Sequence, residues 1–318
     1  MSISILDLEP PACDAEQEIL GGLSKPQKQI SPKYFYDENG SRLFDEICVQ
    51  PEYYPTRTEL GIMQAHVDDI VDLVGPQASV IEFGSGSGLK TRLLLSHLPD
   101  LAAYVPVDIS RETLSRAAES LAADYPDIEV LPVCADFTQP FELPTPCVMP
   151  QRNLVFFPGS TIGNLSADKA VSLLQVMRDE AKDDGALLIG VDLVKPAEIL
   201  EPAYNDAAGV TADFNLNLLE RLNREHDANF SLPTFEHEAV YDTKNRRIEM
   251  RLVSLVKQRV RVAGEAFDLA DGEYIVTEHS HKYSLGQFES MAETAGFSVQ
   301  EVWTDKDNLF SVQYLQAA

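Results

Sequence analysis

The residues best suited to chemistry in this sequence follow an apolar run and alternate with glycine. Residues 80–83 are β-branched, acidic and aromatic, Gly84, Gly86 and Gly88 follow at every second position, and a helical pattern covers residues 89–98. Glycines permit positive φ and let a ligand approach the backbone, because no Cβ intrudes. A strand, a glycine loop and a helix in this order open a nucleotide-type βαβ unit. The pattern therefore favours a ligand site over a simple turn.

The residues around these glycines indicate which ligand is bound. Dinucleotide and P-loop fingerprints both require glycine at the place occupied here by Leu89, although Lys90 and Thr91 would fit the end of a P-loop. The pattern acidic-x-Gly-x-Gly-x-Gly, with Glu82 first, resembles motif I of Rossmann-like methyltransferases that use S-adenosylmethionine (SAM). An acidic residue early in the loop also suits a cationic sulfonium better than a pyrophosphate.

Further polar residues follow the next predicted strands. Asp108 ends the strand over residues 103–107 and lies about twenty residues beyond Gly88, where nucleotide folds place an acid on the ribose hydroxyls. Asp136 and Phe137 follow the strand over residues 129–134. Open α/β sheets bind ligands at the carboxyl ends of their strands, so we expect these acids to face the ligand. A role as a helix cap or turn former is the alternative.

Composition limits the classes of partner. The chain has 318 residues, 44% of them hydrophobic, and a net charge of −26. This acidity argues against nucleic acid and anionic membrane surfaces as partners. No apolar run is long enough to span a membrane, and residues 1–17 do not form a signal peptide. Four scattered cysteines are typical of reduced thiols, so we expect a cytoplasmic protein, which we also expect to be a monomer.

We expect no metal. The six histidines show no zinc-binding spacing. His279 and His281 alternate on one predicted strand but lack a third ligand, which favours a role other than metal binding.

The predicted elements give an α/β fold with two domains. We expect a Rossmann-like SAM-methyltransferase sheet with helices on both faces, ending in an antiparallel hairpin, from residues 61–195 and 286–318. A smaller α+β substrate domain would comprise residues 1–60 and an insertion over 196–285. Within it, Ser41 is a candidate helix cap and residues 51–55 are expected to be extended, before one helix over residues 58–73.

Together these segments resemble one family, the histidine Nα-methyltransferases of ergothioneine biosynthesis, which form trimethylhistidine (hercynine). The resemblance covers the chain from about Ser31 to its C-terminus. Its motifs are Lys33-Tyr34-Phe35-Tyr36-Asp37, Pro51-Glu52-Tyr53-Tyr54-Pro55-Thr56, Gly84-Ser85-Gly86 with Lys90-Thr91, Pro158-Gly159-Ser160-Thr161-Ile162-Gly163-Asn164, Tyr204 before Asp206-Ala207-Ala208-Gly209-Val210-Thr211, and Glu278-His279-Ser280 with Lys282. Several such matches in order are far more specific than the glycine loop alone.

The resemblance also implies site residues. Those that it assigns to SAM are Tyr36, Gly84, Ser85, Gly86, Lys90, Asp108, Asp136 and Phe137. Around the amino and carboxylate groups of the substrate it places Tyr53 and Asn164, which would orient the reacting amine, together with Tyr204. Glu278 and Ser280 would bind the imidazole, and Met250 would line the same pocket.

The spacing of Glu278 and Ser280 agrees with this role. Residues i and i+2 on a strand face the same way, so a carboxylate and a hydroxyl can meet the two imidazole nitrogens. A solvent-facing strand edge is the structural alternative. Two other functions stay open, namely methylation of another amine such as a tryptophan derivative, and a non-catalytic SAM-binding scaffold. The residues do not identify a proton acceptor for the amine.

Overall fold

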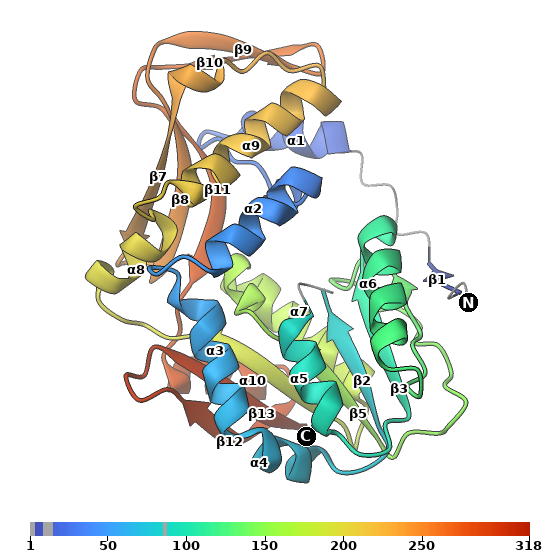
Figure 1. Ribbon diagram of the computed structural model, residues 1–318. Helices are drawn as coiled ribbons and strands as arrows, with labels where there is room; N and C mark the ends of the chain where they lie inside the picture. Colours follow the sequence, from blue (N-terminus) through green and yellow to red (C-terminus); the bar gives the residue numbers. More distant parts are fainter. Residues whose placement is uncertain (1–3, 9–14, 85–87) are drawn as a thin grey trace. The chain divides into compact units, whose positions relative to one another are not determined.

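The computed structural model describes residues 4–8, 15–84 and 88–318, which form two compact units (Figure 1). The first unit contains residues 4–8, Arg57–Leu193 and Tyr283–Ala318, and the second contains residues 15–56 and Val194–Lys282. The start of the chain, placed with the substrate domain by sequence, belongs to the first unit, because a short strand there pairs with the sheet.

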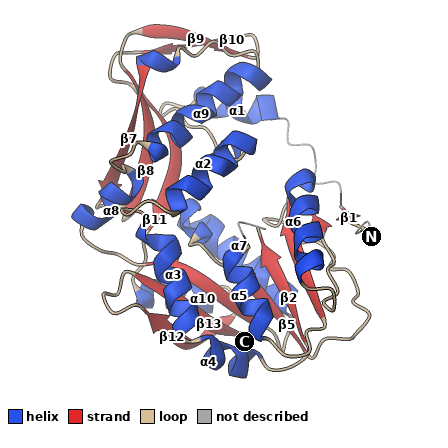
Figure 2. Cartoon of the chain, viewed as in Figure 1, coloured by secondary structure: helices blue, strands red, loops and turns tan. Residues whose placement is uncertain are grey.

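A mixed eight-stranded sheet forms the centre of the first unit (Figure 2). Its strands, in spatial order, are β1 (Leu6–Asp7), β4 (Val133–Cys134), β3 (Ala103–Asp108), β2 (Ala78–Phe83), β5 (Arg152–Phe157), β6 (Ala186–Asp192), β13 (Phe310–Ala317) and β12 (Phe297–Thr304). β1 to β6 are parallel, whereas β13 is antiparallel to both β6 and β12. This confirms the predicted Rossmann-like sheet with its final hairpin.

Helices cover both faces of this sheet because its central strands are buried on both sides. α7 (Ala167–Ala181) and α10 (Leu285–Thr294) pack on the face that carries Phe83. The opposite face packs against α3 (Tyr54–Ala65), α4 (Val67–Val74), α5 (Leu89–His97) and α6 (Arg111–Asp124). Each fully buried aliphatic or aromatic side chain stabilises the fold by about 1.5–3 kcal/mol.

The second unit is built on an antiparallel sheet in the order β11-β8-β7. Its strands are β7 (Phe235–Asp242), β8 (Arg247–Ser254) and β11 (Tyr274–His281), and a separate hairpin joins β9 (Gln258–Val262) to β10 (Glu265–Leu269). Its helices are α1 (Ala15–Leu23), α2 (Glu38–Cys48), α8 (Ala197–Tyr204) and α9 (Val210–Glu225). α9 contacts β7, β8 and α2, and the rings of Phe35 and Phe214 stack with centroids 4.4 Å apart.

Three local predictions were wrong. Tyr54 and Pro55 begin α3 instead of lying in an extended segment, because proline is well tolerated in the first turn of a helix. The helix expected over residues 58–73 is two helices, since the backbone leaves helical geometry at His66 (φ −124°). Asp37, not Ser41, caps α2, with its carboxylate accepting a hydrogen bond from the Gly40 amide.

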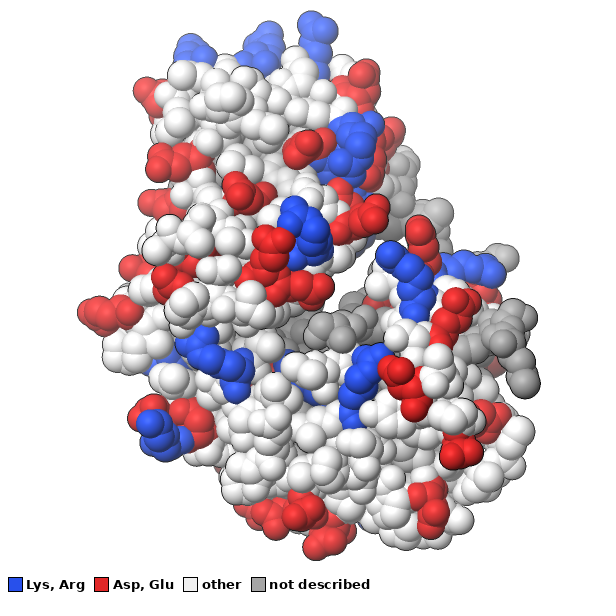
Figure 3. Space-filling model, viewed as in Figure 1, with Lys and Arg blue, Asp and Glu red and all other residues white. Residues whose placement is uncertain are grey.

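Charged side chains of both signs reach the surface of the molecule (Figure 3). Acidic and basic side chains are interspersed on the face drawn in Figure 3, and the chain as a whole is strongly acidic. Among the described residues, no helix combines the length and apolarity that crossing a bilayer requires.

Candidate functional site

The glycine loop lies between the buried strand β2 and helix α5, as predicted. Gly84 and Gly88 have φ of 83° and 71°, a conformation that side chains disfavour. Among the described residues, a Cβ added at Gly84 would meet only the Phe137 ring, at 3.9 Å, so the positive φ explains this glycine better than crowding does. Ser85 and Gly86, also predicted SAM contacts, lie outside the described residues.

Glu82 has a role in the interior rather than at the loop surface. Its carboxylate is 2% exposed and accepts hydrogen bonds from the Thr91 hydroxyl, at 2.7 Å, and from the Tyr104 hydroxyl. Burial raises the pKa of Glu82 to about 7, even though both hydrogen bonds lower it. Glu82 therefore joins β2, β3 and α5 beneath the loop, and its oxygens are occupied by protein donors instead of facing a sulfonium.

Asp108, Asp136 and Phe137 lie near the carboxyl ends of β3 and β4, as predicted. Asp108 accepts a hydrogen bond from the Ser110 amide at 2.8 Å. One carboxylate oxygen of Asp136 accepts from the amide and hydroxyl of Thr138, at 3.0 and 2.7 Å. The Phe137 ring packs on Phe83, with centroids 5.4 Å apart. The hydrogen bonds of each turn hold the aspartate that begins it in place. Two carboxylates and one aromatic ring therefore lie at the edge of the sheet where the glycine loop begins.

Lys90, in the first turn of α5, forms an ion pair with Glu59 of α3. Glu59 is 1% exposed and also accepts hydrogen bonds from the Gly159 amide. Gly159 belongs to the loop after β5, which ends in a 3₁₀ turn, Thr161–Asn164. Asn164 is partly exposed, and its side-chain amide makes no hydrogen bond to any other described residue. Sequence reasoning missed Glu59, for which no local motif provides a signal.

The second unit contains a buried polar cluster at the end of β11. Ser280, Tyr204 and Lys282 are 5%, 7% and 1% exposed. The Lys282 ammonium donates to the Ser280 hydroxyl oxygen at 2.8 Å and to the Tyr204 hydroxyl oxygen at 2.9 Å. The Tyr204 hydroxyl in turn donates to the Ser280 oxygen at 2.9 Å. The Ser280 oxygen thus accepts twice, which leaves its own O–H to donate.

Glu278 lies on the same face of β11 as Ser280. It is opposite Met250 of β8, after a register shift between Val276 and Glu278, and Met250 is buried. Burial raises the pKa of Glu278 to about 7, with the positive charge of Lys282 acting in the opposite direction. The residue is partly exposed, and its carboxylate makes no hydrogen bond to another described side chain or backbone group. It is therefore available as an acceptor for a ligand.

Tyr36 and Tyr53 join this cluster through aromatic contacts. The Tyr53 ring lies edge-on to Tyr204, with centroids 6.1 Å apart, and Phe44 contacts both Tyr36 and Tyr53. Burial, followed by the neighbouring Tyr204, raises the pKa of the Tyr53 phenol well above the ordinary value. Desolvation of the phenol group, followed by the nearby Glu278, also raises the pKa of Tyr36, although the residue as a whole is 44% exposed. Tyr36 thus lies in the second unit with most of the predicted substrate residues, whereas Asn164 and the other described SAM candidates lie in the first.

His279 lies on the opposite face of β11 and does not contact the Glu278–Ser280 side. Its imidazole pairs with Glu249 at 3.2 Å, and Glu249 also accepts hydrogen bonds from Arg247 and Arg251. Burial lowers the pKa of His279, which favours a neutral ring. The described residues contain no group of three potential metal ligands.

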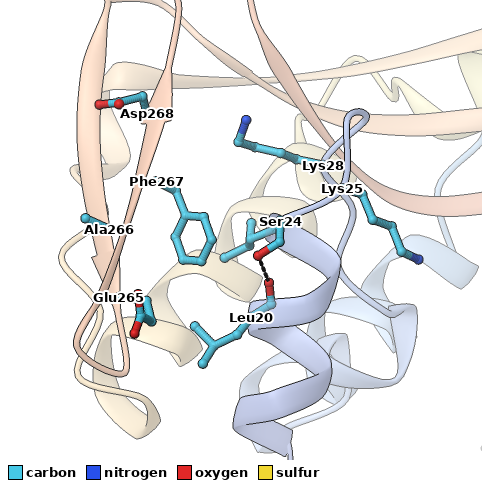
Figure 4. A pocket seen from close by; sticks show the side chains of 9 residues that line it. Leu20, Ser24, Lys25, Lys28, Glu265, Ala266, Phe267 and Asp268 are labelled. Atoms are coloured by element: carbon cyan, nitrogen blue, oxygen red, sulfur yellow. Dashed lines mark hydrogen bonds between the residues drawn. The ribbon is translucent and has the colours of Figure 1, made fainter.

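A separate groove lies in the second unit between α1 and the β9–β10 hairpin (Figure 4). Its volume is about 550 Å³, and Leu20 and Phe267 contribute apolar side chains to it while Lys28 lies nearby. None of its lining residues is a predicted site residue. The polar cluster around Glu278 is therefore the stronger candidate for specific recognition.

The sequence is similar to that of known proteins over nearly the whole chain. Residues 15–317 match the family of histidine-specific, SAM-dependent methyltransferases. The chain belongs to this family. It is 40% identical to the histidine N-alpha-methyltransferase of Mycolicibacterium smegmatis, covering 91% of this chain and 90% of that protein. The corresponding Mycobacterium tuberculosis enzyme is 37% identical, with 93% and 92% covered.

Membership makes the chain a SAM-dependent enzyme of the methyltransferase class. A more distant relative has a different name: the L-tryptophan methyltransferase trpM of Psilocybe serbica is 25% identical and covers 94% of this chain and 92% of that protein. Substrate choice among such relatives must therefore depend on individual pocket residues and not on the fold.

Proposed function

We propose that this enzyme transfers three methyl groups from SAM to the α-amino nitrogen of L-histidine, giving hercynine for ergothioneine biosynthesis. The observation that carries the proposal is the pair formed by Glu278, an unengaged acceptor, and Ser280, whose hydroxyl is left to donate. The named relatives and the family description support the same substrate.

The pair matches a neutral imidazole, which has one N–H donor and one unprotonated nitrogen acceptor. Glu278 accepts from the N–H, and Ser280 donates to the other nitrogen. Lys282 and Tyr204 enforce this direction, because both already donate to the Ser280 oxygen. The two side chains thus bind both edges of the ring with complementary polarity.

The same arrangement discriminates against an indole. An indole ring has an N–H donor but no ring acceptor, so the O–H of Ser280 would remain buried without an acceptor. Sites that leave buried polar groups unpaired reject analogues by about 10⁴-fold in favourable cases. A pocket with an apolar residue at either position would lose this selectivity.

Tyr53, Asn164 and Tyr204 are proposed to hold the amino and carboxylate groups. Because the pKa values of Tyr36 and Tyr53 are raised, both phenols stay protonated at neutral pH. They act as hydrogen-bonding groups and not as proton acceptors. The attacking amine must be neutral, and even the α-amino group of a peptide loses its proton only near pH ~8. Positioning this amine can lower the barrier by about 7–11 kcal/mol.

Most of the described residues proposed to hold SAM lie at the edge of the first unit's sheet. Positive φ at Gly84 and Gly88 favours glycine, whose missing Cβ leaves room for a ligand at these two positions, and Asp108 and Asp136 supply acceptors at neighbouring strand ends. When bound, SAM supplies an electrophilic methyl group. The complete proposed set is Gly84, Ser85, Gly86, Lys90, Asp108, Asp136, Phe137 and Tyr36.

A substrate panel tests the proposal. The purified protein is incubated with SAM and equal concentrations of histidine, tryptophan or phenylalanine, and products are identified by mass. We expect methylated histidine to exceed the other products by at least about 100-fold. Preference for tryptophan would assign the enzyme to another amine, and SAM binding without any product would favour a scaffold. The proposal also includes the predicted monomeric state and cytoplasmic location, which gel filtration and cell fractionation test.

A further inference from the structure

A single buried carboxylate connects the cofactor side of the first unit to the loop that carries Asn164. Glu59, on α3, is 1% exposed. Its two oxygens accept hydrogen bonds from the Gly159 amide at 3.0 and 2.9 Å, and one of them also pairs with the Lys90 ammonium. Three segments that are far apart in the sequence therefore meet at one side chain.

The neighbouring strand leaves space for this carboxylate. A Cβ added to Gly190 of β6 would lie 1.9 Å from Oε1 of Glu59 and 2.7 Å from its Cδ. Gly190 does not have positive φ, so conformation does not require glycine there. Glycine is required there because the Glu59 carboxylate fills the space that a Cβ would need. The sheet is thus shaped around the carboxylate, which indicates a fixed position for it.

The loop that Glu59 holds has an unusual backbone. Gly159 and Ser160 have consecutive positive φ values of 84° and 56°. The Ser160 hydroxyl accepts a hydrogen bond from the Asp192 amide at 2.9 Å. A non-glycine residue in this conformation persists only where its surroundings hold it, and such strain is concentrated at functional sites. Glu59 and Asp192 anchor this loop on either side, four residues before Asn164.

We propose that Glu59 is a positioning residue for methyl transfer, setting Lys90 and the Asn164 loop in place through one carboxylate. The inference rests on the SAM role of Lys90 and the substrate role of Asn164 proposed above. The ion pair with Glu59 uses one of the three N–H groups of the Lys90 ammonium, and the other two can donate to a ligand. The negative charge, and not only the shape of the side chain, is required, because Lys90 is a cation and Gly159 donates to both oxygens.

Glu59→Gln tests the role of the charge, because it keeps the size of the side chain. SAM affinity is measured by calorimetry and turnover with histidine by product formation. We expect the SAM dissociation constant to rise about 10- to 100-fold, the effect of a lost charge-assisted hydrogen bond. We also expect kcat to fall, because the Asn164 loop loses an anchor. Glu180→Gln is the matched control, since Glu180 is a buried glutamate of the same unit outside the proposed site.

A second variant separates positioning from general stability. If Glu59 acts on SAM through Lys90, adding Glu59→Gln to Lys90→Met should change SAM affinity less than about 2-fold. A purely structural role predicts instead that the single Glu59→Gln variant lowers the melting temperature while SAM affinity and kcat stay at the wild-type level. That result would overturn the inference. Wild-type protein that fails to bind SAM would refute the proposed function itself, which distinguishes the two failures.

Discussion

Lys282 donates a hydrogen bond to Ser280, two residues before it, with 2.8 Å between the ammonium nitrogen and the hydroxyl oxygen. Tyr204 donates to the same oxygen, which leaves the Ser280 O–H to donate to another acceptor. The charge of Lys282 also opposes the burial that raises the pKa of Glu278. One buried lysine thus influences both groups proposed to bind the imidazole.

Lys282→Met should weaken histidine binding and leave SAM binding unchanged. Removal of the ammonium leaves the Ser280 and Tyr204 oxygens without a charged donor, which costs about 1.5–3 kcal/mol per hydrogen bond. We expect KM for histidine to rise at least about 10-fold, as measured by steady-state kinetics. Lys28→Met is the control, because Lys28 pairs with Glu273 in the same unit. An equal rise for both variants would contradict the specific role of Lys282.

Ser280→Ala should affect histidine and tryptophan in opposite ways. Histidine loses a donor to its ring nitrogen, so we expect kcat/KM to fall about 10-fold or more. When tryptophan is bound, the substitution removes a buried Ser280 O–H that has no acceptor. The very low activity with tryptophan should therefore rise. The ratio of the two kcat/KM values is the measurement. A parallel fall for both amino acids would indicate a general packing defect and refute ring recognition by Ser280.

The pH dependence of histidine methylation should report Glu278. Its pKa is raised to about 7, so the carboxylate becomes protonated as pH falls through that value. A protonated carboxyl no longer offers a charged acceptor, and kcat/KM for histidine should decrease below pH about 7. In Glu278→Gln this ionisation is absent, so the profile should lose the step due to the carboxylate and keep only the contributions of the substrate's own amine and imidazole. An unchanged profile would show that another group titrates.

Asp37 should stabilise the second unit at neutral pH. Burial alone raises its pKa, but hydrogen bonds from Gly40, Arg224 and Asn217 lower it below the ordinary value. A lowered carboxyl pKa means that the stabilisation is present above the unfolded-state pKa and is lost as pH falls through the folded-state pKa. We expect Asp37→Ala to cost about 1–2 kcal/mol in urea unfolding at pH 7, with a smaller difference in acid.

Asp37→Asn serves as the comparison for this cap. Asparagine still accepts from the Gly40 amide but lacks the charge that pairs with Arg224, so it should cost less than alanine and show little dependence on acid. If alanine and asparagine destabilise equally at every pH, the side-chain cap contributes little.

Local patterns allowed much of the first unit to be predicted. The run from β2 through the glycine loop to α5 follows from residues adjacent in sequence, and so does the cap of α6, where the Ser110 side chain accepts from the Thr113 amide. Tyr54 was placed wrongly because the two prolines around it favour extended backbone locally, while the helix that begins there is stabilised by packing of the residues that follow it.

The most informative site contacts could not be predicted, because they join residues far apart in the chain. Glu59 is an ordinary helical glutamate by sequence, and its partners lie 31 and 100 residues away. Lys282 was visible only as part of a motif, since its hydrogen bond to Tyr204 spans 78 residues. The directions of those hydrogen bonds, which make Ser280 a donor, depend on the folded arrangement alone.

The most direct test of the central claim is tandem mass spectrometry of the product formed from histidine and SAM. Fragmentation locates each added methyl group on the α-nitrogen or on the imidazole. We predict mono-, di- and then trimethylated histidine with every methyl group on the α-nitrogen. Methyl groups on the imidazole, or no methylated histidine under conditions where the protein binds SAM, would contradict it.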